Sequence, residues 1–301
     1  MYGKSVKRRT GLYGTYRLIK ELGRSNNGIV YMAWHRYLRK HMAIKVVENY
    51  STEEIKIHNN EFEALKNIKS VYIPQVFDFV IENNYSFIVI EYIEGESFDK
   101  LLTGKFKFTE AQIIKWYSQL ASALFAIHKL DICHRDIKPA NILLTTNGDI
   151  CLIDFGSAYI SGNDTGLISR SMGYASPEQY EFFKLCKKTY TGENNALSDN
   201  VETALLITDC KTETTSFGSA SIYNKVDKID WKLSDIYSLG ATIYHLLTGD
   251  RPPVKEEETV RISKQKGYSK EILEIIEKSM KTTPSERYIS AEELGVAILR
   301  V

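Results

Sequence analysis

The chain has 301 residues, of which 43% are hydrophobic and 26% charged, ordinary values for a globular protein with a buried core. Its 39 basic and 38 acidic residues leave a net charge of +1, so the overall charge gives no support for a nucleic-acid partner. The four cysteines form no C-x-x-C pair, and no apolar stretch reaches about eighteen residues, which argues against a zinc knuckle, a disulfide framework and a membrane span.

The chain begins with a basic tail, which we expect to span residues 1–13. Four basic residues lie in it, but no apolar run follows them, so the tail is not a secretory signal (Lys4, Lys7, Arg8 and Arg9). With no such signal and so few cysteines, we expect reduced thiols and a cytoplasmic protein.

Residues 14–93 contain short apolar or alternating runs that predict the strands of a small sheet. The predicted strands are Tyr16 to Leu22, Val30 to His35, His41 to Val47, Gln75 to Ile81 and Ser86 to Tyr92. Between the third and the fourth, Glu53 to Ile68 has helical spacing, with an apolar stripe of Ile57, Leu65 and Ile68 and with Phe62 at its edge. A sheet with one helix is therefore the predicted first unit.

From Glu94 onward the apolar spacing becomes helical, which predicts a second, mainly helical unit over residues 94–301. The predicted helices are Thr109 to Lys129, with Thr109 as N-cap, Leu233 to Thr248, Lys270 to Lys281 and Ser290 to Arg300. A polar segment at about residues 189–226 has few apolar anchors and is predicted to be a surface insertion. The two units together predict an α+β fold with two lobes.

Two motifs near the middle of the chain carry the chemistry. The run His134-Arg135-Asp136-Ile137-Lys138-Pro139-Ala140-Asn141 is followed by Asp154-Phe155-Gly156, and strand-like pieces flank both (Ile142 to Leu144 and Ile150 to Ile153). An Asp-Phe-Gly by itself indicates only a turn. At this spacing, however, the pair resembles the catalytic loop and activation segment of the eukaryotic-type (Hanks-type) protein serine/threonine kinases, in a bacterial-like form. The resemblance covers residues 14 to 301 except the insertion and implies the bilobal kinase fold.

The resemblance implies roles that suit these residue types. Phosphoryl transfer depends mainly on positioning and on charge stabilisation. Asp136 would accept the proton of the substrate hydroxyl, and Lys138 would neutralise charge on the transferring group. Asn141 and Asp154 offer the hard oxygen atoms that Mg²⁺ prefers. The implied cofactors are therefore ATP and Mg²⁺, with Mn²⁺ as its substitute.

The part of the chain before these two motifs also resembles the kinase family. The run from Leu22 through Gly23, Ser25 and Gly28 to Val30 resembles the glycine-rich loop over the ATP phosphates, although Ser25 replaces the middle glycine and such a run alone indicates only a hairpin. Ala43-Ile44-Lys45 resembles the strand whose lysine binds the α- and β-phosphates. Its predicted helical partner is Glu61, with Glu63 as the alternative.

The resemblance also implies an adenine pocket. The run from Phe87 to Ile93 corresponds to the last strand and the hinge, in which Ile90 would be the gatekeeper and the backbones of Glu91 and Ile93 would bind adenine. Val30, Ala43 and Leu143 would cover the two faces of the ring, as apolar walls do in ligand pockets.

Other elements of the resemblance imply protein substrates with serine or threonine acceptors. Ala175-Ser176-Pro177-Glu178, the helix around Asp235 to Gly240, and Arg287 as the partner of Glu178 belong to the peptide platform. Lys138 and Ser171 occupy positions typical of serine/threonine rather than tyrosine kinases. Small-molecule kinases generally lack this platform.

Arg135 suggests a hypothesis about regulation. In the family, an arginine before the catalytic aspartate often pairs with a phosphate on the activation segment and orders that segment. The candidate acceptors for autophosphorylation are Ser161, Thr165, Ser169 and Ser171, although each is also an ordinary loop hydroxyl.

Two alternatives remain, a pseudokinase scaffold and a small-molecule phosphotransferase. Only Ser25 favours the first, because Lys45, Asp136, Asn141 and Asp154 are all present. Many bacterial relatives continue into a membrane span and a sensor, whereas this sequence ends at Val301, so we expect a catalytic domain without either. The sequence does not identify the physiological substrate, the signal or the oligomeric state.

Overall fold

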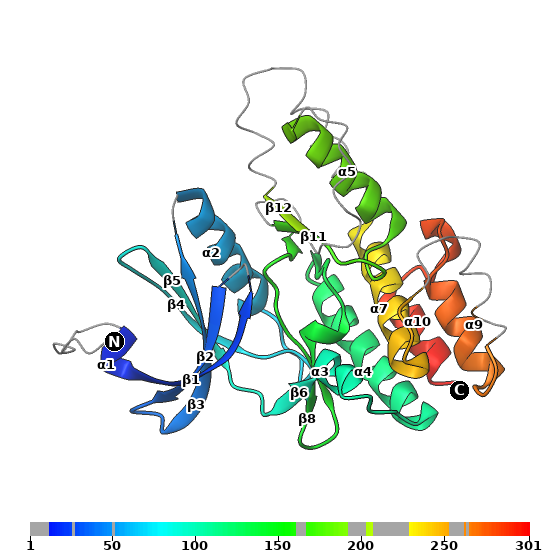
Figure 1. Ribbon diagram of the computed structural model, residues 1–301, viewed down its shortest axis with the longest axis horizontal. Helices are drawn as coiled ribbons and strands as arrows, with labels where there is room; N and C mark the ends of the chain where they lie inside the picture. Colours follow the sequence, from blue (N-terminus) through cyan, green and yellow to red (C-terminus); the bar gives the residue numbers. More distant parts are fainter. Residues whose placement is uncertain are drawn as a thin grey trace.

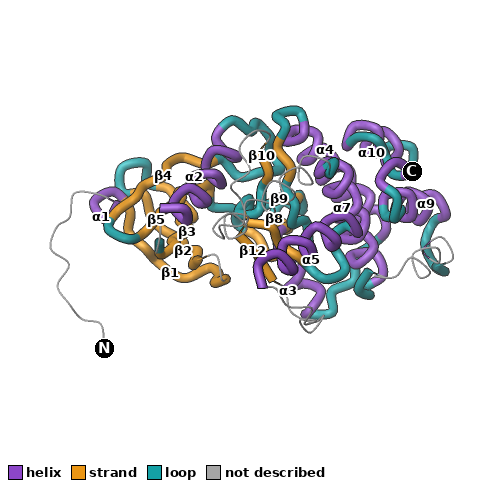
Figure 2. The backbone as a smooth tube through the Cα atoms, turned by 90° about the horizontal axis from the view of Figure 1, so that it is seen from above, coloured by secondary structure: helices purple, strands orange, loops and turns teal. Residues whose placement is uncertain are grey.

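A β-sheet occupies one end of the molecule and a group of helices the other (Figures 1 and 2). The computed structural model describes residues 12–25, 28–49, 52–160, 167–191, 203–206, 229–252, 262 and 265–301. The predicted sheet with one helix followed by a mainly helical region is confirmed. None of the helices formed by the described residues is long and apolar enough to span a membrane.

The sheet has five antiparallel strands in the order β1-β2-β3-β5-β4. The strands are β1 (Tyr16–Ser25), β2 (Gly28–His35), β3 (Lys40–Glu48), β4 (Val76–Glu82) and β5 (Tyr85–Glu91), and each contains most of a predicted strand. The short helix α1 (Leu12–Thr15) precedes β1, and α2 (Thr52–Lys66) connects β3 to the fourth strand along the chain. The side chain of Ile57, predicted to lie on the apolar stripe of this helix, is outside the described set.

Successive side chains along β3 and β5 point to opposite faces of the sheet, so the two faces carry different residues. Met42, Ile44, Phe87 and Val89 are buried in one small apolar cluster, which Leu12 also joins. The residues between them, Ala43 and Lys45 on β3, point to the opposite face because successive strand side chains alternate. The lysine thus lies on the face that meets α2.

Several helices of the second region pack around a continuous apolar core. They are α4 (Glu110–His128), α7 (Trp231–Thr248), α9 (Lys270–Ser279) and α10 (Ala291–Ile298). The predicted N-cap Thr109 is confirmed, since its hydroxyl accepts from Gln112 N while the Gln112 side chain accepts from Thr109 N. Helix α7 begins two residues before its predicted start because Asp230 caps Lys232 N and Leu233 N. Most residues of α7 are buried.

Several short elements lie between the sheet and these helices or between the helices themselves. They are β6 (Gly95–Ser97), α3 (Phe98–Thr103), β7 (Ile132–Cys133), η1 (Pro139–Asn141), β8 (Ile142–Thr145), β9 (Ile150–Leu152), β10 (Tyr159–Ile160) and η4 (Pro284–Glu286). Strands β6, β8 and β9 form a small antiparallel sheet, and β10 pairs with β7. The loop that carries Asp136 therefore lies between β7 and β8, and Asp154 lies two residues after the end of β9.

Helix α5 (Pro177–Thr191) and strand β12 (Thr203–Leu206) are among the elements that were not predicted from the sequence. Helix α5 begins with a proline, which suits the first turn of a helix, yet the sequence analysis assigned Pro177 only to a motif. Strand β12 lies inside the predicted insertion and pairs with β11 (Leu167–Arg170). Within the predicted insertion, residues 189–191 belong to α5 and residues 203–206 to β12, and its other residues lie outside the described ones.

Candidate functional site

A buried lysine connects three elements at the boundary between the two regions. Lys45 Nζ on β3 donates to Glu61 Oε2 on α2 at 2.7 Å and to Asp154 Oδ1 after β9 at 3.0 Å. Lys45 is 6% exposed and Glu61 5% exposed, so both charges are removed from water and need each other. The predicted pair of Lys45 with Glu61 is confirmed. The alternative partner, Glu63, instead forms an ion pair with Lys66.

The electrostatics of this group keep the lysine charged. Burial alone would lower the pKa of the Lys45 ammonium, but the carboxylates of Asp154 and Glu61 outweigh burial and raise it. The same cation lowers the pKa of Asp154 against the effect of burial. For Glu61, burial is the larger influence and raises the pKa of the carboxyl group, although Lys45 opposes it.

Asp136 is the centre of a second group of polar side chains. Its Oδ1 accepts from Ser171 Oγ at 2.6 Å, and its Oδ2 lies 3.2 Å from Lys138 Nζ. Lys138 Nζ also donates to Ser171 Oγ at 3.0 Å. Asn141 Nδ2 donates to Asp136 O at 2.8 Å and to Asp136 Oδ2 at 3.0 Å. The carboxylate is thus held by three side chains while its own side chain remains 10% exposed.

The two groups meet through the backbone. Ile153 N, one residue before Asp154, donates to Asn141 O at 2.9 Å. Lys45, Asp154, Asn141 and Asp136 therefore form a continuous series of contacts from the sheet to the catalytic loop.

The oxygen atoms of Asn141 and Asp154 fit a divalent cation. Because Asn141 Nδ2 is directed at Asp136, the amide oxygen Oδ1 is the atom left for a ligand. The Asp154 side chain is 35% exposed, although Lys45 and Gly156 N donate to its Oδ1. Carboxylate and amide oxygens are ligands that Mg²⁺ accepts together with water and phosphate oxygens.

Two site residues have backbone angles that are rare outside glycine. Arg135 has φ 62° and Asp154 has φ 63°. Such conformations cost energy and persist where the surroundings enforce them, often at functional sites. Here Asp235 on α7 enforces the first, since its Oδ1 accepts from Arg135 N and its Oδ2 from His134 N, each at 2.8 Å.

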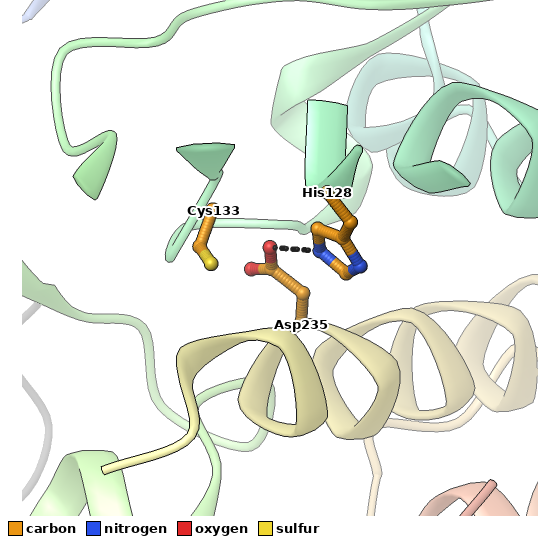
Figure 3. A group of neighbouring side chains, drawn as sticks. All are labelled: His128, Cys133 and Asp235. Carbon is orange, nitrogen blue, oxygen red and sulfur yellow. Dashed lines mark hydrogen bonds and ion pairs between the residues drawn. The ribbon is translucent and has the colours of Figure 1, made fainter. Parts of the chain in front are cut away.

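His128, Cys133 and Asp235 form a buried group whose ligand atoms lie within 4.8 Å of one another (Figure 3). In another setting these residue types hold a transition metal. Here the Asp235 carboxylate already accepts from two backbone amides and bonds His128 Nε2 at 2.9 Å. Burial also raises the pKa of the Cys133 thiol, which disfavours the thiolate that a metal needs. We assign the group as the anchor of the catalytic loop.

The glycine-rich turn joins β1 to β2. Ser25 pairs with Gly28 across the hairpin, while residues 26 and 27 and the side chain of Ser25 are outside the description. Gly28 has φ +118°, and a Cβ there would lie 2.6 Å from Val46 O and 2.8 Å from Val47 Cγ2. Only glycine fits this position, because both the backbone angle and the space exclude a side chain. The glycine that the hairpin needs is therefore Gly28, which is present. Ser25, its partner across the hairpin, replaces a different glycine of the motif.

Most residues of the predicted adenine pocket lie on adjoining strands. Val30 is paired with Lys45, and Ala43 with Ile90, across neighbouring strands. Leu143 lies on β8 and is partly buried. At the end of β5, Glu91 N donates to Gln75 O, and among the backbone hydrogen bonds of the described residues none involves Ile93. The amide and carbonyl of Ile93 are therefore available to a ligand. Leu22 and Gly23 lie on β1, toward the turn.

The predicted pair of Glu178 and Arg287 is also confirmed. Arg287 Nη1 donates to Glu178 Oε1 at 2.6 Å and Nη2 to Oε2 at 2.8 Å, a bidentate geometry. Arg287 is 2% exposed and also donates to the carbonyls of Lys281, Leu233 and Thr282. The pair fixes the start of α5 against α7 and the turn η4.

The structure adds residues that the sequence analysis did not single out. A Cβ at Gly156 would lie 3.2 Å from Lys45 Nζ, so this glycine allows the ion pair to form beside the backbone. Gln179 Nε2 donates to Arg135 O at 2.7 Å, and its Oε1 accepts from Ser234 Oγ. The position of Gly156 in a motif was a signal for its importance. Gln179 directly follows the Ala175-Ser176-Pro177-Glu178 element, but its contact with Arg135 depends on packing between α5 and the catalytic loop, which the sequence does not reveal.

Comparisons with known proteins agree with this geometry. The family model for the protein kinase domain matches residues 16–194. A "Probable serine/threonine-protein kinase" of Clostridium acetobutylicum is 28% identical over 292 residues, covering 95% of this chain and 39% of that protein. A protein of the same description from Saccharomyces cerevisiae is 30% identical over 249 residues, covering 78% and 59%. A serine/threonine-protein kinase of Corynebacterium glutamicum is 32% identical over 176 residues, covering 54% and 38%. The chain thus spans less than two thirds of each relative.

Proposed function

This chain belongs to the protein kinase family, and we propose that it transfers the γ-phosphate of ATP to serine and threonine hydroxyls of proteins. The observation that carries the proposal is the convergence of Lys45, Glu61 and Asp154 from three separate elements. A buried cation held by one buried and one partly buried carboxylate is costly to build. Such a group is reasonable where a polyphosphate must be bound.

In the proposed reaction, each side chain of the site has one task. Lys45 binds the α- and β-phosphates and is held toward them by Glu61. Asp136 orients the acceptor hydroxyl and takes its proton as the new P–O bond forms and the bond to the β-phosphate oxygen breaks. Lys138, 3.2 Å from Asp136, stabilises the charge of the transferring group. Mg²⁺, held by Asn141 and Asp154, would screen the phosphate charges.

The environment of Asp136 supports a serine or threonine acceptor. Ser171 Oγ and Lys138 Nζ both contact the Asp136 carboxylate, so the catalytic loop and the following segment are joined at the acceptor position. Ser171 is 3% exposed, which favours this positioning role over a role as phosphate acceptor. The bidentate pair of Glu178 and Arg287 stabilises the helix that begins just after this segment and supports a protein rather than a small molecule as substrate.

The proposal includes autophosphorylation, for which the candidate acceptors are Ser161, Thr165 and Ser169. Ser161 and Thr165 lie outside the described residues, and Ser169 lies on β11 with its side chain not described. Autophosphorylation between two copies of the chain needs only that one copy present a hydroxyl to the catalytic site of the other.

One assay separates this function from the pseudokinase and the small-molecule phosphotransferase. Labelled ATP and Mg²⁺ are incubated with the wild type, Lys45→Met and Asp136→Asn on generic protein substrates, and the phosphoamino acids are identified. We expect phosphoserine and phosphothreonine from the wild type and a loss of about 10²-fold or more in both variants. ATP binding without transfer would indicate a pseudokinase, and transfer only to small hydroxyl compounds would contradict the protein substrate.

A further inference from the structure

The peptide group that joins Arg135 to Asp136 is bound by side chains at both its oxygen and its nitrogen. Gln179 Nε2 of α5 donates to the carbonyl oxygen, Arg135 O, at 2.7 Å. The amide nitrogen, Asp136 N, donates to His134 Nδ1 at 3.3 Å. A peptide group is planar, so fixing its oxygen and its nitrogen also fixes the direction in which the chain enters Asp136. The bond from Gln179 therefore acts directly on the backbone of the residue assigned to the acceptor hydroxyl.

The backbone of Arg135 itself needs such support. Its φ of 62° is rare outside glycine, and a conformation of this kind persists where the surroundings enforce it. The amide of Arg135 donates to Asp235 Oδ1 of α7 at 2.8 Å, and its carbonyl accepts from Gln179 of α5. Side chains from two helices thus bind the two polar backbone groups of this one residue. Asp235 fixes the side toward His134, and Gln179 fixes the side toward Asp136.

The amide of Gln179 is oriented by two serines. Ser234 Oγ donates to Gln179 Oε1 at 3.2 Å, and Ser176 Oγ accepts from Gln179 N at 3.3 Å. The two serine hydroxyls also lie 2.8 Å apart, and all three residues are 0% exposed. A carbonyl oxygen can only accept, so the amide nitrogen and not the amide oxygen of Gln179 must face Arg135 O. Ser234 directly precedes Asp235, so one turn of α7 supports both contacts to Arg135.

Gln179 also belongs to a part of the chain that contacts the Asp136 carboxylate. Ser171, which donates to Asp136 Oδ1 at 2.6 Å, begins a turn whose carbonyl accepts from Tyr174 N and Ala175 N. Helix α5 starts two residues after this turn, and Gln179 lies in its first turn. The stretch from Ser171 to Gln179 therefore binds Asp136 at its side chain and binds the peptide group before it.

We propose that Gln179 is a positioning residue for phosphate transfer, which orients the peptide group before Asp136 and thereby the carboxylate that takes the proton of the acceptor hydroxyl. The inference rests on the proposed kinase function. A catalytic base must lie within hydrogen-bond reach of the proton that it accepts, and a small displacement slows the reaction strongly. Lys45, Glu61 and Asp154 bind one another and not Gln179. Loss of the Gln179 donor should therefore slow transfer without weakening the binding of ATP.

The first test removes the donor and keeps the shape of the side chain. Gln179→Met retains the unbranched length of glutamine but has no N–H for Arg135 O. We expect the rate of transfer from saturating Mg-ATP to a protein substrate, measured in a single turnover, to fall about tenfold. The KM for ATP should stay within about twofold of the wild type. An unchanged transfer rate, with or without a higher KM for the protein substrate, would overturn the proposal.

A second buried glutamine provides the matched control. Gln119 of α4 is 9% exposed, and its amide donates to Asp149 Oδ1 at 2.7 Å and accepts from Ile150 N at 3.1 Å. Gln119→Met therefore also removes a buried amide that has a donor contact and an acceptor contact, but away from Asp136. We expect both variants to lower the thermal unfolding midpoint and only Gln179→Met to slow transfer. Equal slowing in the two variants would show a general effect of destabilisation and would contradict a positioning role.

A milder variant keeps the test decisive if Gln179→Met does not fold. Gln179→Asn keeps the amide but shortens the side chain by one methylene, which withdraws the donor from Arg135 O, so we again expect transfer to slow about tenfold. A folded Asn variant that transfers at the wild-type rate would overturn the proposal. The outcomes also separate this inference from the function on which it rests. A wild type that transfers no phosphate to protein defeats the proposed function, whereas an active wild type with equally active Gln179 variants defeats only the positioning role.

Discussion

At the scale of single residues, the site depends on how a buried charge is compensated. Lys45 keeps its charge at 6% exposure because two carboxylates lie within 3.0 Å of its ammonium group. Removing one of them leaves a buried cation partly unpaired, which is costly. The geometry also distinguishes two glutamates that sequence spacing left open, Glu61 and Glu63.

The two glutamates provide a matched pair of variants. We predict that Glu61→Gln lowers kcat by about tenfold or more, since the lysine loses its charged partner and swings toward Asp154. Glu63→Gln, which loses only the pair with Lys66, should keep the wild-type rate. Steady-state kinetics with a protein substrate checks both. Equal losses in the two variants would show that Lys45 does not depend on Glu61.

Two glycines of the nucleotide-loop region make a second matched pair. Gly28→Ala forces a Cβ to within 2.6 Å of Val46 O at φ +118°, so we predict a loss of about 1–3 kcal/mol in the free energy of unfolding. A Cβ at Gly23 meets no atom within 4 Å, and Gly23→Ala should change stability by less than about 1 kcal/mol. Urea denaturation of the three proteins measures the difference. A Gly28→Ala protein as stable as the wild type would contradict the described turn.

At the scale of elements, helix α2 carries a titratable side chain whose pKa depends on its burial and on the nearby charge of Lys45. His58 lies one turn before Glu61 and is 8% exposed. Burial, with the Lys45 cation adding to it, lowers the pKa of the imidazole to about 4. The unfolded chain has a pKa of about 6.5 for this group, so between the two values the unfolded state binds a proton that the folded state does not. Stability therefore falls as the pH falls through this window.

We predict that His58→Gln makes the protein less sensitive to acid. Between about pH 7.5 and pH 5, the wild type should lose ~2 kcal/mol more of its unfolding free energy than the variant does. Urea denaturation of both proteins at the two pH values gives the comparison. The absolute stability of the variant does not matter to this test. Identical pH dependences would show that His58 is not held neutral in the fold.

The start of α5 depends on one bidentate ion pair. Arg287→Lys cannot reproduce two parallel bonds to Glu178 or the bonds to three carbonyls, so we predict a loss of about 3–5 kcal/mol in unfolding free energy. The exposed Arg36→Lys serves as the control and should change stability by less than about 0.5 kcal/mol. Differential scanning calorimetry distinguishes the two. A small effect at Arg287 would mean that the helix is fixed by other contacts.

At the scale of the whole molecule, the sequence predicted the sheet, its single helix and the main helices well. Their apolar periodicity is strong, and Thr109 and Ser290 cap helices where capping rules place them. Helix α5 and strand β12 were missed. The first residues of α5 were assigned to the Ala175–Glu178 motif and not to a helix. Strand β12 is stabilised by pairing with β11, and no local pattern in the sequence reveals this contact.

In the candidate site, too, some contacts were predicted from the sequence and others were not. The resemblance to the kinase family correctly implied that Lys45 meets Glu61 and that Glu178 meets Arg287. It could not reveal that Gln179 bonds the Arg135 carbonyl, or that the rings of Tyr159 and Trp231 lie near its guanidinium. These residues are distant in sequence, and their side chains meet only because α7, α5 and β10 pack around the catalytic loop. The roles assigned to the site residues remain predictions that kinetics must test.

The proposed site is tested by comparing phosphate transfer with ATP binding in the same preparations of wild type and Asp136→Asn. Asp136 is assigned to the acceptor hydroxyl and Lys45 to the phosphates, so the variant should bind Mg-ATP with wild-type affinity but transfer the labelled γ-phosphate to protein at least about 10²-fold more slowly. Transfer at the wild-type rate by Asp136→Asn, with binding unchanged, would contradict the assignment of this site.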